Sequence, residues 1–196
     1  MRDISNRLAR LLFRRDTDEE KIKLYEFSIY VLFSSIIHIG SMLVIGFFFN
    51  MIYECLILYF SFIAIRKFAG GYHAKTPIIC YMVSITIIIT SLLLLKSLTK
   101  HNLIDQLYYL FVSSALIALI IIVVISPLDN KNKTLNSKEK KVYKLISIII
   151  STILFFISLS IFNLNETYSI AILFGIILNA LTLLIGKIQI LVSKQL

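Results

Sequence analysis

Charged residues are scarce in this sequence. They make up 16% of its 196 residues, whereas a soluble domain carries about 25%. Hydrophobic residues reach 58% and the mean hydropathy is +0.88. This shortage of charge excludes an ordinary soluble domain and indicates a chain that lies largely within a lipid bilayer.

Cysteine and proline are sparse as well. The two cysteines, Cys55 and Cys80, fall in different hydrophobic segments, so neither a zinc-type spacing nor a disulfide framework is expected. The two prolines, Pro77 and Pro127, lie in loops or at helix starts. The first 24 residues lack a short apolar region followed by a small-residue cleavage site, so we expect no cleavable signal peptide.

Apolar sequence, by contrast, comes in repeated runs near the length of a membrane span. Six such runs predict an all-α fold, a polytopic transmembrane helical bundle that forms one membrane-embedded domain over residues 25–196. Residues 1–24 form a separate cytoplasmic segment. The spans are expected near residues 28–49, 51–65, 78–95, 107–125, 145–162 and 168–191.

The N-terminal segment has the pattern of an amphipathic helix. Its apolar residues share one face and its arginines another: Ile4, Leu8, Leu11 and Leu12 against Arg7, Arg10 and Arg14. Such a helix lies in the headgroup region of the bilayer with its arginines toward anionic lipid. A short helix that caps the bundle is the alternative.

The basic residues predict the orientation of the bundle. With six spans and a cytoplasmic N-terminus, all but Lys96 and Lys100 of the 20 Lys and Arg residues face the cytoplasm, as the positive-inside rule expects. Segment 51–65 is short, about 22 Å at 1.5 Å per residue, yet without it Arg66 and Lys67 would lie outside. Six spans are therefore favoured. Topology also explains the net charge of +9, so no nucleic-acid partner is expected.

The loop between the second and third spans is the segment richest in chemistry. Gly70 and Gly71 permit a sharp, close-packed turn. Thr76 followed by Pro77 is the pattern of a helix N-cap with proline at the first helical position. This pattern places Cys80 on the first turn of the third span.

Cys80 and His73 are the candidate catalytic pair. A helix N-terminus carries about half a positive charge. The cations Arg66, Lys67 and Lys75 also lie a few residues before Cys80 in the sequence. Both features are expected to favour the thiolate of Cys80. His73 can take the thiol proton, and these two groups are the minimum for acyl transfer through a thioester. The alternative is a thiol that only packs and a histidine that is only solvated. No Asp or Asn in the loop orients the histidine, and Ser84 is a weak candidate for that role.

Other polar residues of the spans have structural interpretations. His38 is expected to pair with Glu54 or to hydrogen-bond a neighbouring helix. Cys55 is expected to pack, and Asn179 to link two helices. The stretch Lys131–Lys144 is expected to be a solvated loop that faces lipid, with substrate docking as the alternative.

Two motifs, Arg66 to Cys80 and Pro127 to Lys133, carry a resemblance that covers essentially the full length, including the basic N-terminal segment and the order of the spans. On these features the chain resembles the accessory gene regulator B (AgrB) family. The later motif, Pro127 to Lys133, is similar to the family's Pro…Asn-Lys loop, although Thr134 stands where a proline is common. The more specific motif is Arg66-x-x-x-Gly70-Gly71-x-His73-Ala74 with Cys80 seven residues after the histidine.

This resemblance implies a cysteine endopeptidase of bacterial peptide quorum sensing, located in the cell membrane with its N-terminus and active site cytoplasmic. Cys80 would be the nucleophile and His73 the general base, and four residues would support the loop or the substrate: Arg66, Lys67, Gly70 and Gly71. The implied partners are the lipid bilayer, an AgrD-type propeptide and a second copy of the chain. No metal and no cofactor are implied.

The implied reaction removes the C-terminal tail of the propeptide and leaves a thioester on Cys80. An internal Cys or Ser of the peptide then closes a thiolactone or lactone ring. A small transporter and a non-catalytic membrane scaffold are the competing functions. A transporter needs polar or broken helices at mid-membrane, and a scaffold leaves Cys80 dispensable.

Overall fold

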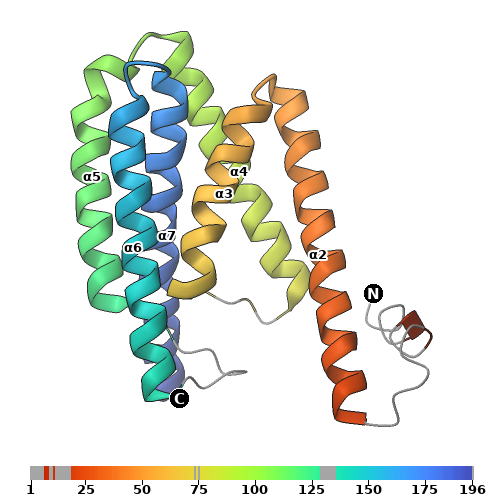
Figure 1. The fold of residues 1–196 in the computed structure, drawn as a ribbon. Helices are drawn as coiled ribbons and strands as arrows, with labels where there is room; N and C mark the ends of the chain where they lie inside the picture. Colours follow the sequence, from red (N-terminus) through yellow and green to blue (C-terminus); the bar gives the residue numbers. More distant parts are fainter. Residues whose placement is uncertain are drawn as a thin grey trace. The chain divides into compact units, whose positions relative to one another are not determined.

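The computed structural model describes residues 7, 8, 11, 19–72, 74, 76–128 and 136–195. All regular structure within these ranges is helical, so the predicted all-α fold is confirmed (Figure 1). The helices are α2 (Glu19–Phe49), α3 (Ile52–Ala69), α4 (Pro77–Lys100), α5 (Ile104–Ile125), α6 (Ser137–Ile161) and α7 (Glu166–Gln195).

The chain divides into two compact units, Met1–Val44 and Ile45–Leu196. The first unit holds most of α2, and Arg7, Leu8 and Leu11 are also helical there. The rest of the predicted amphipathic segment before α2 lies outside the described residues, so that segment and the single membrane domain stay predictions. The candidate site belongs to the second unit.

Five of the described helices are long and apolar enough to cross a membrane: α2, α4, α5, α6 and α7. Every predicted span lies inside one helix except for at most one terminal residue. The helices extend further than the apolar runs because their terminal turns are polar, as at Lys100 of α4 and Ser137 of α6. α3 is not one of the five, since its 18 residues include Glu54, Arg66 and Lys67.

α3 nevertheless runs from one end of the second unit to the other. At its start, the ammonium of Lys96 near the end of α4 donates a hydrogen bond to the carbonyl of Phe49, 3.0 Å away. At its end, Phe68 packs edge-on against Tyr143 near the start of α6. Figure 1 shows α3 alongside α7 over this distance. The arrangement supports α3 passing between the same two ends of the second unit as α4 and α5.

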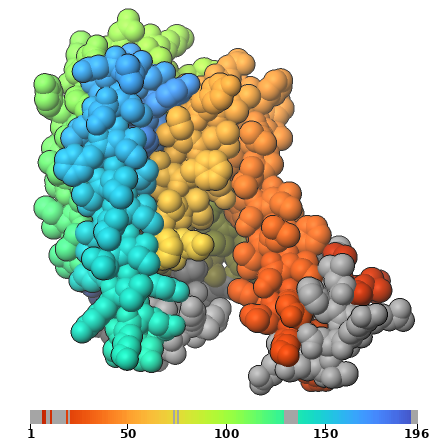
Figure 2. Space-filling view, viewed as in Figure 1, coloured from red at the N-terminus to blue at the C-terminus, as the bar shows by residue number. Residues whose placement is uncertain are grey.

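α7 is the central helix of the second unit. It packs extensively against α3, α5 and α6, and most of its apolar stretch is buried. The other apolar helices expose many large hydrophobic side chains, which is what helices facing lipid require. Figure 2 shows α6 (cyan) beside α3 (yellow to orange) on one face of this unit.

Small and polar residues bring α3 and α7 close together. A Cβ placed on Gly175 would lie 2.7 Å from the Cβ of Ser61. One turn further, the Asn179 side chain donates a hydrogen bond of 3.2 Å to the carbonyl of Phe62. This bond confirms Asn179 as a link between helices, and the glycine allows the close backbone approach typical of membrane helix pairs.

The remaining polar residues fall partly as predicted. Cys55 is fully buried, and a Cβ on Gly46 would lie 3.2 Å from its Cβ, so its packing role is confirmed. His38 and Glu54 belong to different units, so their pairing stays a prediction.

The basic residues of the second unit gather at its two ends as the topology requires. Lys96 and Lys100 lie at the end where α4 finishes. The last turn of α3 and the first turns of α6 lie at the opposite end, and with them Arg66, Lys67, Lys138, Lys140, Lys141 and Lys144. The assignment of this second end to the cytoplasm stays a prediction from the positive-inside rule.

Reporter fusions test both the crossing of α3 and the orientation. A phosphatase that is active only outside the cytoplasm should be active when fused after Asn102 and inactive when fused after Asn136, because three and four helices precede these points. A fusion after Asn50, which follows α2 alone, calibrates the assay. The opposite pattern at Asn102 and Asn136, with an active fusion at Asn50, would show that α3 does not cross.

Candidate active site

Cys80 lies in the first turn of α4, as predicted. Thr76 is the N-cap, and its hydroxyl accepts a hydrogen bond of 3.3 Å from the amide of Ile79. Pro77 occupies the first helical position, and the amide of Cys80 donates to the carbonyl of Thr76. The thiol is free and partly exposed, so it is accessible. Because Cys80 is in the first turn of α4, its side chain also lies at the positive end of the helix dipole.

The loop that leads to α4 begins with two glycines whose φ angles, 79° at Gly70 and 142° at Gly71, other residues rarely adopt. There is also no room for a side chain at either position. A Cβ on Gly70 would lie 2.8 Å from the carbonyl oxygen of Leu128, and a Cβ on Gly71 would lie 2.8 Å from Nη1 of Arg66. The predicted close-packed turn is confirmed.

Arg66, in the last turn of α3, joins this loop to the start of α4. Its Nη2 donates a hydrogen bond to the carbonyl of Tyr72, and its guanidinium lies 5.4 Å from the ring centroid of Phe62, a cation–π contact. The side chain of Cys80 lies within interaction distance of the same guanidinium. Arg66 therefore contacts both the candidate nucleophile and the residue that precedes His73.

One donor of Arg66 is left without a partner. Nη1 is buried and makes no hydrogen bond of ordinary geometry to any described residue. Arginine keeps its charge in proteins, and an unpaired buried donor costs about 1–3 kcal/mol. The site thus holds a positive charge beside Cys80, which favours a negative charge that forms there during a reaction.

Tyr72 is held at both of its backbone polar groups. Its N–H donates a hydrogen bond of 2.9 Å to the carbonyl of Thr182 in α7, while its carbonyl accepts from Arg66. The start of the same loop is held as well, because the amide of Leu128 donates a hydrogen bond of 3.0 Å to the carbonyl of Ala69, directly before Gly70. The role of Thr182 could not be predicted from the sequence, because its acceptor is a main-chain carbonyl and every residue type has one.

The other predicted site residues are placed as follows. His73 and Lys75 lie outside the described residues, so the role of His73 stays a prediction. Lys67 is exposed, with its ammonium 5.8 Å from the ring centroid of Phe68. The hydroxyl of Ser84 donates to the carbonyl of Cys80 at 3.0 Å. Ser84 is thus bonded to its own helix, which weakens it as the group that orients the histidine.

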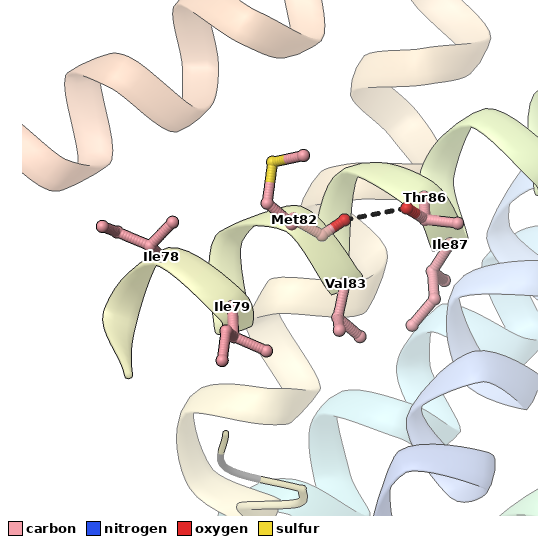
Figure 3. A pocket seen from close by; sticks show the side chains of 6 residues that line it. All are labelled: Ile78, Ile79, Met82, Val83, Thr86 and Ile87. Atoms are coloured by element: carbon pink, nitrogen blue, oxygen red, sulfur yellow. Dashed lines mark hydrogen bonds between the residues drawn. The ribbon is translucent and has the colours of Figure 1, made fainter. Parts of the chain in front are cut away.

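An apolar groove of about 310 Å³ runs along α4 beside the turn that carries Cys80. Figure 3 shows its lining side chains along this helix, with the hydroxyl of Thr86 turned back to the carbonyl of Met82. That hydroxyl is therefore already bonded, and the surface offered is mainly hydrocarbon. The lining residues are Ile78, Ile79, Met82, Val83, Thr86 and Ile87. Within the described part of the chain, no group of His, Cys, Asp or Glu side chains is arranged to hold a metal ion.

Comparison with known proteins identifies one family over most of the chain. The family model described as accessory gene regulator B matches residues 4–183. The chain belongs to the accessory gene regulator B family. It is a multi-pass membrane protein of accessory gene regulator quorum sensing. The family is involved with the AgrD propeptide.

Similar proteins come from several bacteria. The chain is 36% identical to accessory gene regulator protein B of Staphylococcus aureus (strain MW2) over 75% of each chain. It is 31% identical to AgrB-like protein 2 of Clostridium perfringens (strain 13) over 85% of this chain and 82% of that protein. It is also 31% identical to accessory gene regulator protein B of Staphylococcus epidermidis, over 69% and 66% of the two chains. No solved structure matches.

Arg66→Lys tests the role of the guanidinium. Lysine keeps the charge but lacks the planar fork, so it cannot donate to Tyr72 and contact Cys80 in the same way. We expect slower alkylation of Cys80 by iodoacetamide and at least a tenfold loss of peptide processing, about the value of one charge-assisted hydrogen bond. Lys138→Gln, at an exposed lysine on the same end of the unit, is the control and should leave both rates unchanged. Wild-type rates in Arg66→Lys would contradict a specific role for the guanidinium.

Proposed function

We propose that the chain is a membrane cysteine endopeptidase that cleaves an AgrD-type propeptide, with Cys80 as nucleophile and His73 as general base. The observation that carries the proposal is the placement of Cys80, partly exposed in a helix's first turn and against the guanidinium of Arg66. The chain contains its own comparison, because Cys55 is fully buried as a packing cysteine should be. Only one of the two thiols has the surroundings that activate a nucleophile.

In the first step, the thiolate of Cys80 attacks the carbonyl carbon of the scissile peptide bond. The C–S bond forms, and the C–N bond breaks when the protonated His73 gives its proton to the leaving amine. The C-terminal tail leaves as a free amine, and the rest of the peptide remains bound to Cys80 as a thioester.

In the second step, a thiol or hydroxyl within the bound peptide attacks the thioester carbonyl. His73, now neutral, takes the proton of that group, and Cys80 leaves as a thiolate. The product is a cyclic thiolactone or lactone, and the enzyme returns to its starting state. One thioester is exchanged for another in the thiolactone case, so the step needs no nucleotide to drive it.

Arg66 supports both steps through charge. Each step passes through a tetrahedral intermediate with a negative oxygen, and donors that are already in place for that oxygen are a major source of catalysis. Nη1 of Arg66 is buried without a partner among the described residues, and the guanidinium that carries it lies beside Cys80. It is therefore a suitable donor for the oxyanion.

The thioester must also survive until the ring closes. Water that reached it would give a linear acid in place of the ring. The hydrocarbon-lined groove next to Cys80 is a surface on which apolar parts of a peptide or lipid chains can displace water. A position at the end of the membrane-embedded helices favours cyclisation in the same way.

The two competing functions fit the structure less well. A transporter binds its substrate at broken helices near mid-membrane, whereas α3 to α7 are each assigned as one continuous helix. A scaffold would not need a cationic side chain beside an accessible thiol. The homodimer and the cytoplasmic position of the site stay predictions from the family resemblance and the charge pattern.

Replacement of each cysteine by alanine tests the nucleophile. Co-expression of Cys80→Ala with a candidate propeptide should abolish tail cleavage, as measured by mass spectrometry of the peptide products. Cys55→Ala removes a buried thiol remote from the loop and should preserve cleavage per molecule of membrane-inserted protein. Continued tail cleavage by Cys80→Ala would end the protease proposal.

His73→Gln tests the general base. Glutamine keeps hydrogen-bonding capacity but does not accept a proton at neutral pH, so cleavage should fall by about 10²- to 10⁴-fold, the usual contribution of general acid–base catalysis. His101→Gln is the matched control, because His101 follows α4 at the opposite end of the unit. The assay is again the yield of released tail. Equal yields from the two variants would assign the base to another group.

A further inference from the structure

We propose that Gly186 of α7 is a positioning residue of the active site, because its missing side chain leaves a main-chain carbonyl open for the loop that carries His73. The inference rests on the proposed function for its effect on cleavage. Its structural basis is independent of it.

The carbonyl in question belongs to Thr182 and accepts the N–H of Tyr72 at 2.9 Å. Residues 182 and 186 are one helical turn apart, and every Cα–Cβ bond in a helix tilts toward its N-terminus. A side chain at position 186 would therefore lie over the carbonyl of residue 182. Glycine leaves this carbonyl accessible from the side, so the loop can bond to it.

The distances show how little room there is. A Cβ on Gly186 would lie 2.8 Å from the carbonyl carbon of Gly71 and 2.8 Å from the amide nitrogen of Tyr72. Both are backbone atoms, so they cannot rotate away as a flexible side chain would. The addition of one methyl group must displace the loop or the helix.

The loop cannot move aside without disturbing the site. Gly71 is also surrounded closely. A Cβ on Gly71 would lie 2.8 Å from Nη1 of Arg66 and 3.1 Å from the hydroxyl of Thr182. Arg66 in turn is bonded to the carbonyl of Tyr72 and contacts Cys80. Displacement of the loop therefore changes both the start of the His73 segment and the cation beside the nucleophile.

Gly175, earlier on the same helix, is a useful contrast. Its Cβ would meet Ser61 and Phe62 of α3, so this glycine serves helix–helix packing, and the close contact lies away from the loop. Gly186 is the one of the two whose close contact is with loop backbone. An added methyl at either position should destabilise the fold through overpacking, but only the one at 186 should act on the chemistry.

The experiment compares Gly186→Ala with Gly175→Ala and with Gly40→Ala, where a Cβ meets nothing within 4 Å. Each variant is assayed in native membranes for propeptide cleavage and for alkylation of Cys80 by iodoacetamide, read by mass spectrometry. The amount of folded protein is measured as the fraction that resists added protease, and both rates are divided by this amount. The unfolding temperature of each variant is measured in detergent. Wild type and Cys80→Ala are run beside them.

We expect Gly186→Ala to lose about 100-fold in cleavage per folded molecule, the usual cost of a misplacement of about 1 Å, with slower alkylation of Cys80. Gly175→Ala should lower the unfolding temperature without changing either rate, and Gly40→Ala should match wild type. This combination supports the positioning role, since loss of stability alone would not alter the reactivity of a thiol in molecules that remain folded.

Three results would overturn the inference: wild-type rates in Gly186→Ala, an equal loss of both rates in Gly175→Ala, or protease-resistant protein from Gly175→Ala and none from Gly186→Ala. The last would make Gly186 a folding residue. Failure of the proposed function is separate, because wild type and Cys80→Ala would then yield the same peptide products. The alkylation rate would still test the position of the loop.

Discussion

The end of the second unit that carries the candidate site depends on the burial of one cation, Arg66. A guanidinium taken out of water must find hydrogen bonds and compensating charge, and Arg66 finds them in the carbonyl of Tyr72 and the ring of Phe62. Its Nη1 has no hydrogen-bond partner among the described residues, and the guanidinium lies beside the side chain of Cys80. The glycine at position 71 follows from this burial, because a side chain there would take the space of the guanidinium. The glycine of the loop and the surroundings of the Cys80 thiol thus both depend on this one guanidinium.

Most of the helices could be predicted from the sequence, because long apolar runs are enough to define them. Their direction across the membrane stays a prediction from the basic residues at their ends. The identity of the central helix could not. All six runs are similarly hydrophobic, and what distinguishes α7 is close packing, which depends on where Gly175 and Asn179 meet α3. A glycine and an amide in an apolar run are weak signals until the partner helix is known.

The candidate site shows the same division. The N-cap at Thr76, the proline after it and the position of Cys80 could be predicted because they depend on neighbours in the sequence. The bond from Tyr72 to Thr182 joins residues more than a hundred positions apart, and its acceptor is a backbone carbonyl. Sequence patterns describe side chains, so a contact made by main chain on main chain is visible only in three dimensions.

The main-chain carbonyl of Thr182, which accepts a hydrogen bond from the loop, leads to an unusual expectation about which mutations abolish function. At most sites function is lost when atoms are removed, as when a nucleophile or a charge is deleted. Here the acceptor belongs to the backbone, which no substitution at Thr182 deletes, and the vulnerable position is the glycine one turn later. Residue 186 is therefore the position at which a larger side chain would block the contact, whereas a substitution at residue 182 keeps the carbonyl. A chain of this family that carried a larger residue at 186 would need a different path for its loop.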